Sequence, residues 1–332
     1  MSAFLPDQTR ISQVHLRTAR LEPALAFYTG VLGLKVLPGP GPRAIVSAAG
    51  ESPGLIVLSE DRNAAPRPRR STGLYHFAIR YPRREDLAQA YQRLVTSGYP
   101  IAGASDHGVS EAIYLSDADG NGVELYVDRP RAEWPWHNGQ IAMVTRPLDL
   151  DNLLATIEHQ SDPAAAAAKI DIGHIHLHVA DLAVAERFYC EFLGLAVTQR
   201  SYPGALFFAA GGYHHHIGVN AWAGKAVPAA NSVGLISYRL EVPVTEIQYC
   251  LKHRAPLLGY EADMEKGNPR LLQIRDPNGT WLEIEPAPTP ATFDPGPVCS
   301  ADVQAATISA PFQGTHRKHL ERKLTYAIKP NG

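Results

Sequence analysis

The chain repeats itself, and this internal repeat constrains its fold more than any other feature. The segment ISQVHLRTARLEPALAFYTGVLGL at 11–34 matches IGHIHLHVADLAVAERFYCEFLGL at 172–195 with a constant offset of 161 residues. A second pair, IYLSDADGNGVELY at 113–126 and LQIRDPNGTWLEIE at 272–285, is offset by 159 residues. The two halves of the chain therefore follow one structural plan.

Each half divides again into two similar units. In the first unit, alternating apolar residues predict a strand, and apolar residues spaced by three or four predict a helix that ends at Gly33. The pattern restarts at Leu74, where a strand is followed by a predicted helix over 84–97 that ends at Gly98. We therefore expect an α+β fold whose mixed sheets pair into cups. It is built from four βαβββ modules at roughly 11–60, 73–127, 172–220 and 233–286.

The expected domain boundaries follow the repeat. Modules 1 and 2 form a first domain, modules 3 and 4 form a second, and a linker with a short helix near 149–158 connects them. The N-terminal tail is short, and the C-terminal extension is Pro-rich at first and basic later. The predicted segments are 1–10, 11–127, 128–171, 172–286 and 287–332.

The charge and the distribution of apolar residues argue against some classes of binding partner. Lys and Arg total 31 against 33 Asp and Glu, and a net charge of −2 argues against a basic face for nucleic acid. No apolar stretch approaches the ~18 residues that a membrane span needs, and the N-terminus lacks the pattern of a signal peptide. We therefore expect a cytoplasmic protein with small-molecule partners, and no nucleic-acid or membrane partner.

Four motifs carry a family resemblance. The pattern FY-x₃-LGL occurs twice, and the turns DADGNGVE at 117–124 and DPNGTWLE at 276–283 each end in a glutamate. With these motifs the chain resembles the vicinal oxygen chelate superfamily, which includes glyoxalase I, bleomycin resistance proteins and extradiol dioxygenases. The segments GLYHFAIR, SDHGVSEAIYLSDADGNGVELYVDRP and GGYHHHIGVNAW are most similar to two-domain bacterial catechol 2,3-dioxygenases.

The resemblance implies which residues bind a metal, because the ligands of this superfamily come from the first strands of two modules and the last strand of one. Modules 2 and 3 then supply His76, Glu124 and His174, whereas modules 1 and 4 supply Gln13, Leu235 and Glu283. Leucine cannot bind a metal. Only the first set is a triad of two histidines and one carboxylate, which leaves one face of an Fe(II) ion open. This set requires modules 2 and 3 to pair.

The resemblance also implies three catalytic residues. Tyr114 lies ten residues before Glu124 and His107 lies seventeen before it, at positions that orient the substrate in extradiol dioxygenases. The sequence around His215 matches the sequence around the acid–base histidine of extradiol dioxygenases. If residues 213–216 form a strand, alternation sends His215 to one face and its two histidine neighbours to the other. Which of the three histidines at 214–216 is catalytic stays open at this point.

The expected function is therefore that of an extradiol dioxygenase. It would insert both atoms of O₂ into catechol or a simple substituted catechol to give a 2-hydroxymuconic semialdehyde, with Fe(II), or in second place Mn(II), as cofactor. A glyoxalase-like lyase or isomerase is the second possibility, and it would use the same cup with Ni²⁺, Co²⁺ or Zn²⁺ and no O₂. If neighbouring modules pair instead, Gln13, His76 and Glu124 would form its metal site. A metal-free binding or resistance protein is the third possibility, although it would not need the triad. We also expect a homo-oligomer.

Overall fold

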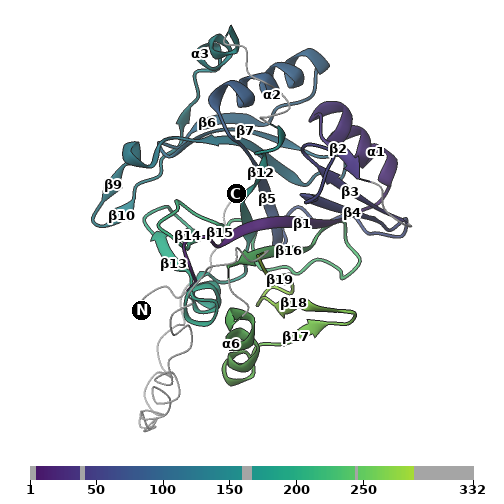
Figure 1. Cartoon of the computed structure of the whole chain (residues 1–332), viewed down its shortest axis with the longest axis vertical. Helices are drawn as coiled ribbons and strands as arrows, with labels where there is room; N and C mark the ends of the chain where they lie inside the picture. Colours follow the sequence, from purple (N-terminus) through teal and green to yellow (C-terminus); the bar gives the residue numbers. More distant parts are fainter. Residues whose placement is uncertain (1–4, 38–41, 159–166, 244–245, 288–332) are drawn as a thin grey trace, which may run out of the picture. The chain divides into compact units, whose positions relative to one another are not determined.

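The computed structural model describes residues 5–37, 42–158, 167–243 and 246–287. The C-terminal extension expected at 287–332 lies outside the described residues except for Ala287. The described chain forms two large curled sheets and the small hairpin of β9 (Trp136–His137) and β10 (Gln140–Ile141), with short helices packed against the sheets (Figure 1). This α+β arrangement of repeated βαβββ modules confirms the predicted fold class.

The first large sheet holds modules 2 and 3, with β11 (Arg146–Pro147) of the linker at one edge. Its order is β11-β6-β7-β8-β5-β12-β15-β14-β13, and β5 runs antiparallel to β12 at the centre. The pairing of modules 2 and 3 that the ligand pattern requires is thereby confirmed. The strands are β5 (Gly73–Tyr81), β6 (Gly103–Asp106), β7 (Ser110–Ser116), β8 (Gly122–Asp128), β12 (Asp171–His178), β13 (Ala196–Gln199), β14 (Ala205–Ala209) and β15 (Ile217–Asn220).

The second large sheet holds modules 1 and 4 in the order β17-β18-β19-β16-β1-β4-β3-β2. Its strands are β1 (Arg10–Thr18), β2 (Lys35–Leu37), β3 (Arg43–Ser47), β4 (Ile56–Glu60), β16 (Gly234–Val242), β17 (Ala262–Glu265), β18 (Asn268–Arg275) and β19 (Trp281–Pro286). Each half of the repeat gives one module to each sheet. The division of the chain into domains at 11–127 and 172–286 stays a prediction.

The helices follow the repeat, with one departure from the prediction. The α2 helix (Arg84–Ser97) has the predicted bounds, and Gly98 ends it in the left-handed region with φ 66°. The sequence predicted one α-helix before Gly33. In the structure only α1 (Leu21–Leu25) is α-helical, and Ala26–Val31 form a π-helical turn. Module 3 repeats this with α5 (Leu182–Glu186) and the π turn Arg187–Phe192. A spacing of three or four residues does not distinguish the wider turn from an α-helix.

The remaining helices are short. The linker contains α3 (Leu150–Leu154), which continues as a 3₁₀ turn to Glu158, close to the predicted 149–158. Module 4 contributes α6 (Glu246–Arg254), and further 3₁₀ turns span Arg131–Glu133 and Pro256–Leu258. Among the described residues, no helix is both long and apolar enough to cross a membrane.

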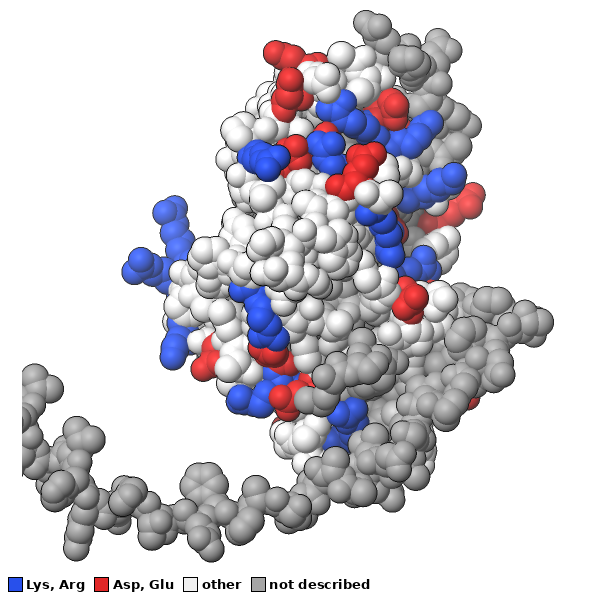
Figure 2. All heavy atoms as spheres, turned by 90° about the vertical axis from the view of Figure 1, so that its left-hand side faces the viewer, with Lys and Arg blue, Asp and Glu red and all other residues white. Residues whose placement is uncertain are grey.

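The FY-x₃-LGL motifs are core segments. Phe27 and Tyr28 are buried on the first π turn, and their counterparts Phe188 and Tyr189 are buried on the second. Gly33 then takes φ 79°, which lets the chain reverse into β2 at little steric cost. On the face of the molecule in Figure 2, acidic and basic side chains are interspersed over a largely uncharged surface.

Candidate metal centre

Strand register brings the expected metal ligands to one face of the first sheet. His76 on β5 pairs directly with His176 on β12, and Ala78 pairs with His174. Ala78 also pairs with Glu124 on the neighbouring strand β8. Because directly paired residues point to the same side of a sheet, His76, His174 and Glu124 converge.

Two irregularities in the β5–β12 pair shape this face. One lies at Gly173, where a Cβ atom would come within 1.6 Å of the Tyr126 hydroxyl, so only glycine fits. The other lies at Tyr75, which is an extra residue opposite His176 and Leu177. The Tyr75 ring lies 4.8 Å from the His76 ring and 5.2 Å from the His176 ring. The bulge therefore places a tyrosine ring beside the candidate ligands.

The three ligand atoms lie close together and are buried. His76 Nε2 is 3.0 Å from Glu124 Oε2, and His174 Nε2 is 3.1 Å from the same oxygen. One ligand atom from each residue lies within 4.8 Å of the other two. Burial alone would raise the pKa of the Glu124 carboxyl, but His174 and then His76 lower this pKa well below its usual range. Burial lowers the pKa of His174 to about 4, so the ring is neutral, as a metal ligand must be.

The local chemistry fits a metal ion. His76 Nε2 is buried and makes no aligned hydrogen bond within the described part of the chain, although Glu124 is near. Buried polar atoms normally have partners, so an unpaired nitrogen aimed at a carboxylate needs an explanation. Two imidazole nitrogens and one carboxylate form the donor set of open-faced Fe(II) sites. A divalent cation would satisfy the nitrogen and the carboxylate together.

These residues line a cavity of about 550 Å³. Tyr114, His107 and His215 line it as well, so the structure places all six predicted site residues around one space. Aromatic side chains cover much of the remaining wall, and the sequence analysis assigned a role to none of them. They are Tyr75, Tyr202, Phe207 and Trp222.

Tyr114 and His107 form a hydrogen-bonded pair. His107 Nδ1 donates to the carbonyl oxygen of Val144 in the linker at 2.6 Å, and a neutral ring therefore accepts at Nε2. The Tyr114 hydroxyl, 2.6 Å away, donates to that nitrogen. Burial and the Glu124 charge raise the pKa of Tyr114 well above its usual value, so the phenol stays protonated. The linker thus fixes the orientation of this pair.

The histidine run at 214–216 differs from the prediction. These residues precede β15, which begins at Ile217, and so they do not alternate as a strand. His214 is adjacent to His215, with 2.8 Å between their Nδ1 atoms. The expectation that His214 points away from His215 is therefore wrong. A bent segment can turn neighbouring side chains toward each other, whereas a strand cannot.

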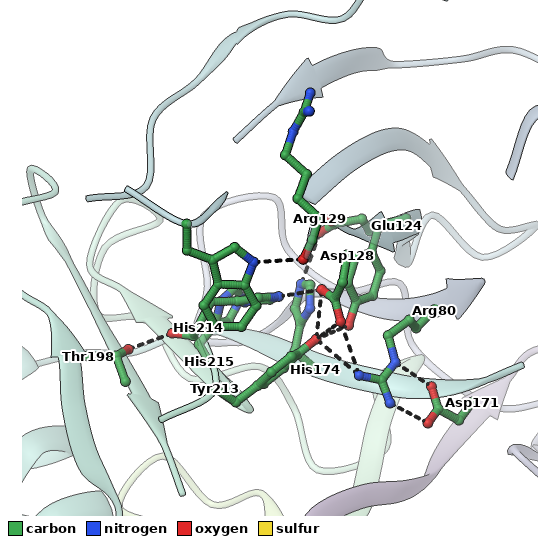
Figure 3. Close-up of polar contacts among 12 residues, drawn as sticks. Arg80, Glu124, Asp128, Arg129, Asp171, His174, Thr198, Tyr213, His214 and His215 are labelled. Carbon is green, nitrogen blue, oxygen red and sulfur yellow. Dashed lines mark hydrogen bonds and ion pairs between the residues drawn. The ribbon is translucent and has the colours of Figure 1, made fainter. Parts of the chain in front are cut away.

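A chain of hydrogen bonds leads from the partly exposed Arg80 and Asp128 to the buried His215 (Figure 3). His214 Nε2 donates to Asp128 Oδ1 at 2.8 Å, and Asp128 is held by the Tyr213 hydroxyl and by Arg80. Since a carboxylate only accepts, a neutral His214 must accept from His215 Nδ1. The sequence analysis missed Asp128. Its position four residues after Glu124 on one strand, and hence on the same face, was the available signal.

The second candidate set does not form a metal site. Glu283 is bound by the Arg239 guanidinium at 2.9 Å and by the Ser237 hydroxyl at 2.8 Å. Gln13 donates to the carbonyl oxygen of Gly54. Ser237, not Leu235, is the structural counterpart of His76, because Ser237 pairs with His15 as His76 pairs with His176. The alignment of Leu235 with His76 was therefore wrong by two residues, but neither residue completes a triad.

Comparisons with known proteins agree with the repeat. A family model described as the Glyoxalase/Bleomycin resistance protein/Dioxygenase superfamily matches residues 10–125 and 171–284. A catechol-2,3-dioxygenase from Bacillus subtilis (strain 168) is 41% identical over 285 residues, which cover 83% of this chain and 97% of that protein. A biphenyl-2,3-diol 1,2-dioxygenase 2 from Rhodococcus globerulus is 28% identical over 119 residues, covering 36% of this chain and 63% of that protein.

A solved structure supports the fold. Glyoxalase I from Zea mays superposes with a TM-score of 0.53 at 15% identity, and the match covers 84% of this chain and 92% of that chain.

Proposed function

The chain belongs to the glyoxalase/bleomycin resistance protein/dioxygenase superfamily and is a catechol 2,3-dioxygenase-like enzyme, and from this premise we propose a specific reaction. It cleaves the ring of catechol or a simple substituted catechol beside the two hydroxyls. Both atoms of O₂ enter the product, a 2-hydroxymuconic semialdehyde. The observation that carries this proposal is the convergence of two histidines and one carboxylate on a cavity that also holds His215 and Tyr114.

In this proposal His76, Glu124 and His174 hold Fe(II), with Mn(II) as the second choice. The bound metal would bring the catechol oxygens and O₂ together, acidify the hydroxyls and carry electrons from the ring to oxygen. The protein supplies the open coordination face and the groups around it. The neutral buried imidazole of His174 and the ionised buried carboxylate of Glu124 favour the metal-bound state over the empty one.

His215 is the proton carrier in the proposed reaction. Its Nδ1 is engaged with His214, so Nε2 is the nitrogen left to act on substrate. Burial first, and then the neighbouring histidines, lower the pKa of His215 well below its usual value. A neutral Nε2 takes a proton from a catechol hydroxyl and returns it to oxygen later in the cycle. Asp128 stabilises His214 when the proton is shared along the chain.

Tyr114 and His107 position the substrate oxygen. The Tyr114 hydroxyl donates its one hydrogen bond to His107, whose other ring nitrogen is held by the Val144 carbonyl, so the phenol oxygen is the atom left to accept from a substrate hydroxyl. A fixed acceptor of this kind orients a catechol hydroxyl before the reaction begins. The pair therefore acts on substrate geometry and not on metal retention.

The version of the glyoxalase-like alternative that uses Gln13 loses its premise, because Gln13 lies on β1 in the sheet formed by modules 1 and 4, apart from His76. The version that uses the same three ligands with Ni²⁺, Co²⁺ or Zn²⁺ is separated from the dioxygenase by experiment. We keep as expectations that the enzyme acts in the cytoplasm and as a homo-oligomer.

The test is anaerobic reconstitution with Fe(II), followed by catechol and then a measured amount of O₂. We expect one O₂ consumed per catechol and a yellow ring-opened product containing both oxygen atoms from ¹⁸O₂. Absence of O₂ uptake by fully iron-loaded, folded protein would overturn the proposal. Isomerisation of a hemithioacetal with Ni²⁺ or Zn²⁺, and no catechol cleavage, would favour the lyase instead.

A further inference from the structure

The cavity is larger than its proposed substrate. Ligand pockets of roughly 300–1,000 Å³ hold drug-sized molecules, and this one measures about 550 Å³. A single ring with two hydroxyls, held at the metal ligands, leaves much of that space empty. The enzyme has room for a catechol that carries a substituent.

Arg67 supplies a cation in the wall of the same cavity. Apart from histidines, Arg67 and Glu124 are the lining residues with formal charge, and Glu124 is engaged by His76 and His174. Arg67 Nη1 donates to the Leu74 carbonyl oxygen, and within the described segments no carboxylate pairs with the guanidinium. Burial lowers the pKa of Arg67, which marks a partly desolvated cation, and the charge of Asp117 opposes this shift without forming an ion pair. Its remaining N–H groups are available to a ligand.

Local structure places this cation near the candidate metal ligands. Arg67 is anchored to Leu74, which lies two residues before His76 on β5, a distance of about 7 Å along a strand. Gly73 takes φ 115°, and a Cβ atom there would lie 3.6 Å from Arg67 Nη1. The bulged Tyr75 ring lies 4.8 Å from the His76 ring and 5.8 Å from the Trp222 ring. Arg67, the two aromatic rings and the candidate metal ligands therefore line the same cavity.

From these relationships, and resting on the proposed function, we infer that the physiological substrate is a catechol bearing an anionic substituent, and that Arg67 binds the anion. A carboxylate is the simplest group that matches the planar, multiply donating guanidinium. The metal ligands and Tyr114 would hold the diol, while Tyr75 and Trp222 would pack against the substituent. The sequence analysis expected only an unsubstituted or simply substituted catechol.

The experiment compares acids with matched amides. The iron-loaded enzyme is assayed with catechol, with 3,4-dihydroxyphenylacetate and 3-(2,3-dihydroxyphenyl)propionate, and with the uncharged amide of each acid. We expect kcat/KM for at least one acid to exceed that of its amide by about 10–100-fold, the usual worth of a charge-assisted contact. Arg67→Met should bring the acid-to-amide ratio close to one, with the amide as the reference substrate in the same preparation. Arg67→Lys should keep part of the preference.

Two controls distinguish the loss of anion binding from a general effect of substitution on folding and from a failure of the proposed reaction. Arg69→Met changes an exposed arginine outside the cavity and should leave the acid-to-amide ratio unchanged. Binding of 4-hydroxyphenylacetate, measured by calorimetry on the same proteins without turnover, should weaken in Arg67→Met alone. An acid-to-amide ratio that is the same in wild type and Arg67→Met overturns the inference, even if catechol is cleaved. Failure to cleave catechol at all overturns the proposed function instead.

Discussion

The Tyr28 hydroxyl donates a 2.8 Å hydrogen bond to Asp117 Oδ2, which joins the first helical segment of module 1 to the turn before Glu124 in module 2. The repeat reproduces this contact between Tyr189 and Asp276 at 3.3 Å. The sheets join modules 2 with 3 and 1 with 4, whereas these contacts join 1 with 2 and 3 with 4. The two family motifs are therefore partners, and one pair supports the turn that leads into a candidate metal ligand.

We predict that Tyr28→Phe destabilises the protein by about 1–2 kcal/mol, because a buried carboxylate loses one donor. The loss is limited because Asp117 Oδ2 still accepts from the Asn121 side chain at 2.9 Å. Urea denaturation measures the change. Tyr249→Phe is the matched control, since Tyr249 is 66% exposed and its variant should differ from wild type by less than about 0.5 kcal/mol. Equal effects of the two substitutions would remove the structural role given to Tyr28.

Much of the fold followed from the repeat. Periodicity located the modules and gave α2 its bounds, because a long amphipathic helix ended by glycine has a strong local signal. The pairing of modules 2 and 3 followed from chemistry, since no other pairing brings His174 to His76 and Glu124. Long-range contact was predictable here because a metal site must collect its ligands from separate strands.

The errors have a common origin in backbone irregularity. The repeat offsets of 161 and 159 residues allow two alignments of module 4, and only strand register shows that Ser237 corresponds to His76. The bend at 214–216 carries no periodic signal, so the contact of His214 with His215 was missed. Arg67 precedes β5 in an irregular segment, and its position in the cavity wall depends on tertiary structure alone.

His215→Asn should separate proton transfer from metal binding. We expect the variant to retain iron and anaerobic catechol affinity, and to turn over about 10²–10⁴-fold more slowly, the usual contribution of a positioned acid or base. Iron content, catechol binding and the steady-state rate are measured on one preparation. Loss of iron would mean that His215 is a ligand, and an unchanged rate would mean that it takes no part in the reaction.

Asp128→Asn should act through His214 and His215. The amide can present its N–H₂ group to His214 Nε2, which would disturb the order of donors and acceptors along the chain. We expect turnover to fall about 10–100-fold with iron retained. The double variant Asp128→Asn/His215→Asn should be no slower than His215→Asn alone. Multiplied losses in the double variant would show that Asp128 acts independently of His215.

His15 in the second sheet should make stability sensitive to acid. Burial, and then Arg43, lower its pKa from 6.5 to about 4 in the folded protein, so the unfolded chain binds the proton more tightly between these values. The free energy of unfolding should therefore fall as the pH drops from about 6.5 to 4, by about 1–3 kcal/mol. His15→Gln should show a smaller fall over the same range of pH, whereas His137→Gln, at an exposed site, should match wild type. Identical slopes in all three proteins would contradict the assignment.

The central claim is that one of two repeated glutamates holds the metal. Iron bound per chain, measured with catechol turnover in wild type, Glu124→Ala and Glu283→Ala, tests it most directly. Glu283 is neutralised by Arg239, so its variant should lose some stability while it still binds one iron and turns over at close to the wild-type rate. Glu124→Ala should lose both iron and turnover while remaining folded. Equal loss from the two variants, or an iron-replete and active Glu124→Ala, would contradict the account.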